Sequence, residues 1–145
     1  MGTHIPQSLP TLCGSIMGSL FSLSAKIHNA AYAALGLDYT FVCFGVEDPV
    51  AAVAAIRALG VRGMNVSMPY KTAVMPHLDS IDESARVIGA VNTINHVDGR
   101  LTGYKRPDLV VEAFRGLPYP LTVVGKGAMV PALRARATPN VEFID

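Results

Sequence analysis

The amino-acid sequence predicts an α/β fold in which helices flank a mostly parallel sheet. Apolar, β-like runs alternate with helix-compatible segments along the chain. Helix start and stop signals, such as Asp48-Pro49 and Gly60, separate these segments. At 145 residues, 50% hydrophobic and 16% charged, the chain is long and apolar enough to bury a core.

The expected elements follow in chain order. We expect a short strand over 11–14, a helix capped by Ser24 and ended by Gly36, a strand over 39–46, a helix over 49–59, a strand over 64–68 and a short helix after Pro69. Asp82 is expected to cap a helix that runs to Ile88. The runs AVNTINH and RLTGY then form a hairpin around Asp98-Gly99, and a helix over 107–115 ends at Gly116.

The composition changes after this helix. The segment GLPYP (116–120) contains two prolines and one glycine and is typical of a linker. Beyond it LTVVG, AMVPALRARA and VEFID predict a strand, a helix and a strand. We therefore predict a first domain over 1–115 and a partial βαβ segment over 116–145.

Composition also excludes several function classes. The formal net charge of +1 gives no reason to expect nucleic acid or an anionic membrane as a partner, and no apolar run approaches the ~18 residues of a membrane-spanning helix. Cys13 and Cys43 lie in apolar runs and predict free thiols in a reducing compartment. We expect a soluble, cytoplasmic protein. The four histidines are scattered without ligand spacing, so we expect no metal site.

Polar residues follow several of the predicted strands. In open parallel sheets ligands bind at the carboxyl ends of strands, where Ser67, Lys71 and Asn92 are expected. Ser22 and Ser24 form a Ser-x-Ser pair at a helix start, where hydroxyls and amide groups suit a carboxylate. Simpler interpretations stay open: a solvated surface lysine, helix-capping serines and a hydrogen-bonded strand-end asparagine.

Four segments together resemble a known family. FSLSAKIHNAAYAALGLDY, RALGVRGMNVSMPYK, ESARVIGAVNTI and DGRLTGY occur in the order and approximate spacing of the shikimate dehydrogenase family. The resemblance covers about residues 11–104, the N-terminal substrate-binding domain of that family. The segment VSMPYK is most similar to the sequences of its shikimate dehydrogenase-like branch.

The resemblance implies an activity and a role for each residue. It implies reversible, NAD(P)-dependent oxidation of the secondary alcohol of shikimate or a related hydroxy acid such as quinate, within the shikimate pathway of aromatic amino acid biosynthesis. Ser22 and Ser24 would hold the substrate carboxylate, Ser67 and Asn92 its hydroxyls, and Lys71 would be the catalytic lysine. A lysine beside the reacting hydroxyl can accept its proton and stabilise the developing oxyanion.

The chain departs from the family pattern after the hairpin. The family carries Gly-x-Asn-Thr-Asp there, with its second catalytic group at the aspartate, whereas residues 103–108 read GYKRPD. Pro107 stands at the aspartate's place, and Asp108 follows one residue late. Asp108 is the candidate replacement. The alternative is an acidic residue that simply favours the first turn of a helix.

The C-terminal segment resembles the start of a Rossmann domain. Gly125, Gly127 and Ala128 would bring the backbone close to a pyrophosphate, and Asp145 follows Gly125 at the spacing of a ribose-binding acid. A plain strand–turn–helix is the alternative. The cofactor would be NADP or NAD. Only one βαβ unit is visible where a full site needs two, which suggests a shortened or rearranged member.

Three hypotheses about function remain. The chain is a shikimate dehydrogenase-like oxidoreductase, a non-catalytic module that binds shikimate- or quinate-type carboxylates, or a fragment stable only as a homo-oligomer or with a partner chain. Loss of the Asn-Thr-Asp motif favours the second hypothesis. An exposed sheet edge would favour the third.

Overall fold

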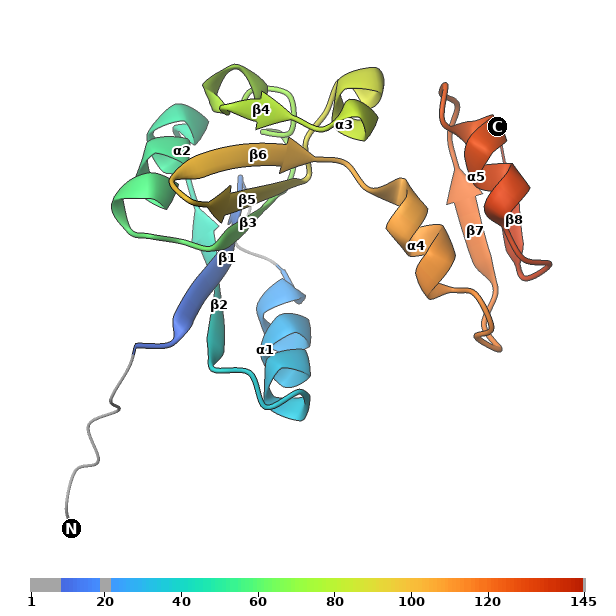
Figure 1. The fold of residues 1–145 in the computed structure, drawn as a ribbon, viewed down its shortest axis with the longest axis horizontal. Coiled ribbons are helices and arrows are strands. Elements are labelled where there is room, and N and C mark those ends of the chain that lie inside the picture. Colours follow the sequence, from blue (N-terminus) through green and yellow to red (C-terminus); the bar gives the residue numbers. More distant parts are fainter. Residues whose placement is uncertain (1–8, 19–21, 145) are drawn as a thin grey trace, which may run out of the picture.

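A computed structural model describes residues 9–18 and 22–144. In these residues a six-stranded sheet has the strand order β2-β1-β3-β5-β6-β4, and a separate two-stranded sheet consists of β7 and β8. Figure 1 shows the large sheet with its helices, followed along the chain by α4 and the small sheet. The predicted α/β architecture with a partial βαβ unit is confirmed.

The helices and strands alternate through most of the chain. In order they are β1 (Thr11–Met17), α1 (Ser24–Ala34), β2 (Tyr39–Gly45), α2 (Pro49–Ala58), β3 (Gly63–Val66), the 3-10 turn η1 (Met75–His77), β4 (Ser80–Ile81), α3 (Glu83–Ile88), β5 (Thr93–Val97), β6 (Arg100–Tyr104), α4 (Pro107–Ala113), β7 (Leu121–Val124), α5 (Val130–Arg136) and β8 (Val141–Ile144).

The large sheet is mixed. β1 pairs in parallel with β2 and β3, and β4 pairs in parallel with β6. β5 is antiparallel to both β3 and β6. The β5–β6 pair is a hairpin, in which Asp98 and Gly99 both have positive φ, at 48° and 73°, as a tight two-residue turn requires. Most of the strand pairs are therefore parallel, as predicted.

Several boundaries differ from the sequence prediction. β1 runs on to Met17, β3 ends at Val66, and the two-residue strand β4 was not predicted. The helix expected after Pro69 is a series of turns followed by η1. Pro76 lies within this segment and has no amide hydrogen to donate, which prevents a regular α-helix.

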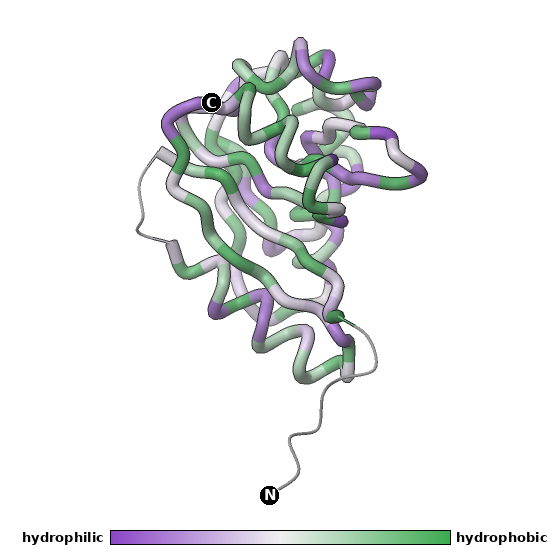
Figure 2. Tube along the Cα trace, turned by 90° about the vertical axis from the view of Figure 1, so that its left-hand side faces the viewer, coloured by the Kyte–Doolittle hydropathy of each residue, from purple (hydrophilic) through white to green (hydrophobic). Residues whose placement is uncertain are grey.

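The core lies between the large sheet and its covering segments. Its largest fully buried side chains are Ile16, Ile56, Val61, Val74, Val91, Ile94 and Leu101. In Figure 2 the strands carry mostly hydrophobic residues, and hydrophilic residues are common in the turns and interspersed along the helices. Asp48 caps α2 as predicted, because its carboxylate accepts hydrogen bonds from the amides of Val50 (2.8 Å) and Ala51 (3.1 Å).

Side chains of α1 fix this helix to the edge strand β2. The Asn29 side chain donates to the carbonyl of Phe41 (3.0 Å) and accepts from its amide (2.8 Å). The ring of His28 stacks on the Phe41 ring with centroids 4.2 Å apart, so His28 packs between α1 and β2. Asn29 also occupies backbone groups of an edge strand that another chain could otherwise pair with.

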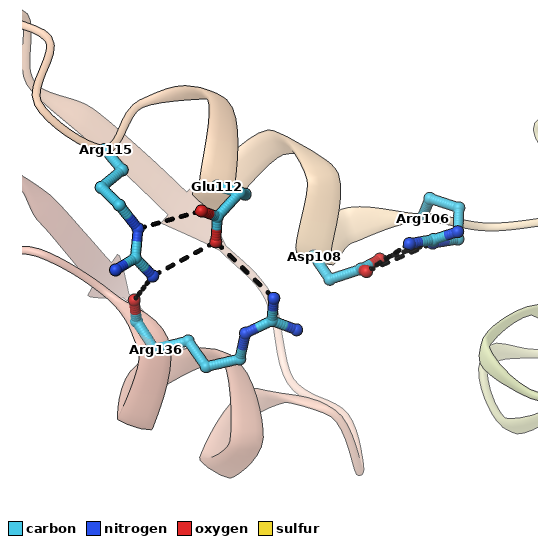
Figure 3. Close-up of polar contacts among 5 residues, drawn as sticks. All are labelled: Arg106, Asp108, Glu112, Arg115 and Arg136. Carbon is cyan, nitrogen blue, oxygen red and sulfur yellow. Dashed lines mark hydrogen bonds and ion pairs between the residues drawn. The ribbon is translucent and has the colours of Figure 1, made fainter.

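The C-terminal part joins α4 to the small parallel sheet. Glu112 of α4 pairs with Arg115 (3.1 Å) and with Arg136 of α5 (3.6 Å), as Figure 3 shows. A domain boundary between residues 115 and 116 stays a prediction. No described helix has both the length and the apolar character needed to cross a membrane.

Candidate functional site

A polar cavity of about 480 Å³ lies where β1 and β3 end and β5 begins. Ile16 lies beside Val66, and Asn65 beside Thr93, so these strand ends meet at one edge of the sheet. The lining residues are Ser15, Met17, Ser22, Ser24, Asn65, Val66, Ser67, Met68, Lys71, Asn92 and Thr93. The structure therefore brings together Ser22, Ser24, Ser67, Asn92 and Lys71, all predicted from the sequence.

Two serines form one wall of the cavity. Ser22 precedes α1, and its Oγ accepts a hydrogen bond from the Ser24 amide (3.1 Å) and donates one to the Ser24 Oγ (2.9 Å). Ser24 is the first helical residue and makes no cap hydrogen bond, so its predicted N-cap role is wrong. The linked hydroxyls lie side by side on the cavity wall and suit a carboxylate.

Residues in and just after β3 line the floor of the cavity. Met64 and Val66 of β3 are buried, and the alternating direction of strand side chains therefore turns Asn65 and Ser67 to the other face. The Ser67 amide donates to the carbonyl of Ile16 (2.9 Å), which holds the residue against β1. The Asn65 side chain lies 3.4 Å from the His28 ring nitrogen, so β3 and α1 meet beside the cavity.

A backbone hydrogen bond fixes the position of Lys71. Its carbonyl accepts from the amide of Val91 (2.9 Å), which ties the segment after β3 to the start of β5. The side chain is half-buried and lines the cavity. Among the described residues its ammonium group has no hydrogen-bond or ion-pair partner, so a bound ligand can take up its donors.

Asn92 lines the same cavity as the serines. Its amide donates to the Tyr104 carbonyl (2.9 Å) and its carbonyl accepts from the Val66 amide (2.8 Å). Its side-chain oxygen accepts from the Thr93 hydroxyl (3.1 Å). The backbone is therefore fixed between β3 and β6, while the side chain lines the cavity.

Asp108 is paired with Arg106, and within the described residues no hydrogen bond or ion pair joins it to Lys71. Asp108 is absent from the cavity wall. The carboxylate accepts from Nε (2.9 and 3.2 Å) and Nη2 (2.8 Å) of Arg106, as Figure 3 shows. These hydrogen bonds hold the pKa of Asp108 below its ordinary value. Its catalytic role stays a prediction, and this geometry gives it no support.

A second cavity of about 260 Å³ adjoins the first. Asn92 lines both; the second is also lined by Lys105, Arg106, Pro107, Val110, Leu121, Thr122 and Val123. Burial lowers the pKa of Lys105, and the charge of nearby Lys71 lowers it further. Lys105 stands where the family has an asparagine, so this second lysine is a feature of this chain.

The glycine loop after β7 has room for a ligand. Gly125 has a φ of 138°, which favours glycine, and a Cβ added at Gly127 would meet nothing within 4 Å. An open cavity of about 570 Å³ here is lined by Lys126, Gly127, Val130, Pro131 and Arg134. Ala128 is not among these lining residues, and Asp145 lies outside the described residues.

Sequence reasoning assigned no role to three polar residues on the wall of the main cavity: Ser15, Asn65 and Thr93. The period of two along a strand could have identified Asn65, because Ser67 was already a candidate and residues two apart share a face. Ser15 is a buried serine in an otherwise apolar run, and its sequence context carries no such signal.

The carboxyl edge of the strands in an α/β sheet is the usual place for a small-molecule site, and the polar cavity lies at this edge. Residues 17–94 match the model of the shikimate dehydrogenase substrate binding domain. The shikimate dehydrogenase (NADP(+)) of Streptococcus uberis is 54% identical over 81 residues, which are 54% of this chain and 28% of that protein.

Solved structures agree with the sequence match. The shikimate 5-dehydrogenase of Listeria monocytogenes, in complex with shikimate and NAD, is 32% identical with a TM-score of 0.72, covering 99% of this chain and 54% of that one. The quinate dehydrogenase of Corynebacterium glutamicum, in complex with NAD, is 27% identical with a TM-score of 0.69, covering 92% and 54%.

The chain therefore belongs to the shikimate dehydrogenase family. The match is to the substrate-binding domain and part of the region that follows it. The chain spans about half the length of these solved relatives and a smaller share of the curated one.

Proposed function

We propose that this chain binds a shikimate- or quinate-type hydroxy acid and acts as a shikimate dehydrogenase-like oxidoreductase on its secondary alcohol. One observation carries the proposal: residues from three separate segments, namely Ser22 and Ser24, Ser67 and Lys71, and Asn92, line one cavity. A cavity of about 480 Å³ has room for a six-membered ring acid.

In this proposal the serine pair binds the carboxylate. Two hydroxyls already linked at 2.9 Å lie on one wall, so little side-chain freedom is lost when they turn to a ligand. Ser67 and Asn92 bind ring hydroxyls, because a hydroxyl and an amide can each donate and accept. Asn65 lines the same cavity and adds an amide to this set.

Lys71 is proposed as the acid–base group. Oxidation of a secondary alcohol removes the hydroxyl proton as the hydride leaves carbon, and in the reverse direction the proton returns. A lysine amine beside that oxygen takes the proton, and its ammonium form stabilises the oxyanion. Lys71 is suited to this because it lines the cavity and its backbone is fixed by Val91.

The hydride acceptor would be the nicotinamide ring of NADP or NAD, the cofactors named for the curated and solved relatives. The residues after β7 fit a cofactor phosphate in two respects. Gly125 and Gly127 leave the backbone open, and Lys126 lines the adjoining cavity with a positive charge. These residues are the proposed cofactor contacts, together with Ala128 and Asp145 from the sequence pattern.

A second candidate function is ligand binding without hydride transfer. It is favoured by the Arg106–Asp108 pair, because a carboxylate held by a guanidinium at 2.8 Å is not available to Lys71. Proline at position 107 also leaves no carboxylate at the family's own place. The cavity would then recognise the acid, and no turnover would follow.

Turnover assays separate the two candidates. Purified chain is incubated with shikimate or quinate and NADP or NAD, and reduced nicotinamide is followed by absorbance. The enzyme proposal predicts turnover that Lys71→Met abolishes and Lys26→Met leaves unchanged, since Lys26 is an exposed residue of α1. Substrate binding by both variants without any turnover by the unmodified chain would support the binding module instead.

A further inference from the structure

Two lysines flank Asn92 on adjoining cavities. Lys71 lines the main cavity, Lys105 lines the smaller one, and Asn92 lines both. The backbone brings them together, because the amide of Val91 donates to Lys71 and the amide of Asn92 donates to Tyr104, the residue before Lys105. Lys71 and the residue before Lys105 are therefore joined by backbone hydrogen bonds to two consecutive residues, Val91 and Asn92.

Their charges are not compensated within the described residues. No aspartate or glutamate is among the lining residues given for either cavity. Neither ammonium group forms a hydrogen bond or an ion pair with another described residue. Arg106 also lines the smaller cavity, but its guanidinium is taken up by Asp108. Two like charges near each other, both on half-buried residues, are unfavourable unless an anion binds between them.

We propose that Lys105, with the adjacent charge of Lys71, binds a second anionic group of the substrate. A dianion matches two ammonium groups better than a carboxylate does, so the ligand class is a hydroxy acid that also carries a phosphate monoester. This inference rests on the proposed function for the first anion, the carboxylate at Ser22 and Ser24.

The proposal explains the departure from the family pattern at residue 105. An asparagine there would offer one neutral amide, whereas a lysine adds a full charge and three donors. The lowered pKa of Lys105 agrees with a site that is complete only with an anion bound. A bound dianion would raise that pKa again and draw a proton from solution.

The test uses inorganic sulfate, which is a tetrahedral dianion with no titration of its own near neutral pH. Calorimetry at constant ionic strength measures sulfate binding to the unmodified chain and to Lys105→Gln, Lys105→Arg and Lys26→Gln. We expect saturable binding that weakens about tenfold or more in Lys105→Gln, because a hydrogen bond to a charged group is lost. Lys105→Arg keeps the charge and should retain most of the affinity. Lys26→Gln should bind as the unmodified chain does.

Proton uptake gives a second readout. Titration in buffers of different ionisation heat, at a pH just below the ordinary lysine pKa of about 10.4, should show protons taken up on sulfate binding by the unmodified chain and not by Lys105→Gln. Absence of sulfate binding, or equal binding by the unmodified chain and Lys105→Gln, would overturn the inference. Shikimate is titrated separately. If shikimate fails to bind while the sulfate effect is present, the proposed function fails and the anion site stands.

Discussion

Gly103 connects the packing of the core to the candidate site. It lies buried in β6, and a Cβ added there would come 2.5 Å from Cδ1 of Leu78 and 2.7 Å from Cγ2 of Val91. The Leu78 atom is the end of a flexible side chain and can move. Val91 is fully buried and β-branched, so it can move only with its backbone. Because Val91 precedes Asn92, that shift reaches the cavity wall.

We therefore predict that Gly103→Ala destabilises the fold. Overpacking of a core costs about 1–3 kcal/mol, and the lower entropy of the unfolded alanine variant offsets roughly 0.4–1 kcal/mol of this. The net loss in unfolding free energy is about 1–2 kcal/mol. With a urea m-value of about 1–3 kcal/mol/M, the unfolding midpoint should fall by roughly 1 M.

Gly63→Ala is the matched control in urea unfolding. Gly63 is also a strand glycine, but apart from its chain neighbours the atom nearest to its added Cβ would be Sγ of Cys13, at 3.8 Å. We expect this variant to be as stable as the unmodified chain or slightly more stable. If Gly103→Ala unfolds at the same urea concentration as the unmodified chain, or if both variants are destabilised equally, the packing argument is refuted.

Three further predictions concern single interactions. Asp48→Ala should lower the unfolding free energy by about 1 kcal/mol in chemical denaturation, because the cap of α2 is lost, and Asp48→Asn should restore most of it. Asn29→Ala should cost about 1–3 kcal/mol, since both backbone groups of Phe41 lose their partner; no change in unfolding midpoint would disprove this role. Because Arg106 keeps the pKa of folded Asp108 below its ordinary 3.8, the pair stabilises the fold above that pH and ceases to do so as pH falls through the folded pKa. The difference in melting temperature between the unmodified chain and Asp108→Asn should therefore shrink from about pH 4 to pH 2, and a constant difference would count against the ion pair.

The local signals in the sequence predicted much of the fold. Asp48-Pro49, Asp82 and Asp98-Gly99 each occupy the predicted helix start or turn, because their side-chain acceptors or backbone preferences act within a few residues. The strand β4 was missed because two residues carry no periodic pattern. Its pairing with β6 depends on a long-range contact, Ser80 with Thr102.

Part of the candidate site could also be predicted from local signals in the sequence. Ser22, Ser24, Ser67, Lys71 and Asn92 were recognisable from motif order and from their place at strand ends, and one cavity contains them all. The environment of Asp108 was not predictable, since its distance from Lys71 depends on how the chain leaves β6. The adjoining cavity with Lys105 depends on the approach of β7, which lies beyond the linker.

The central claim is that the serine pair and its neighbours form a binding site for a shikimate-type acid. Calorimetric titration of the purified chain with shikimate, alongside Ser22→Ala and the surface variant Lys26→Ala, tests it most directly. The account predicts saturable binding, about tenfold or more weaker in Ser22→Ala because a hydrogen bond to a carboxylate is removed, and unchanged in Lys26→Ala. An absence of binding at millimolar shikimate, or equal affinity for the unmodified chain and Ser22→Ala, would contradict it.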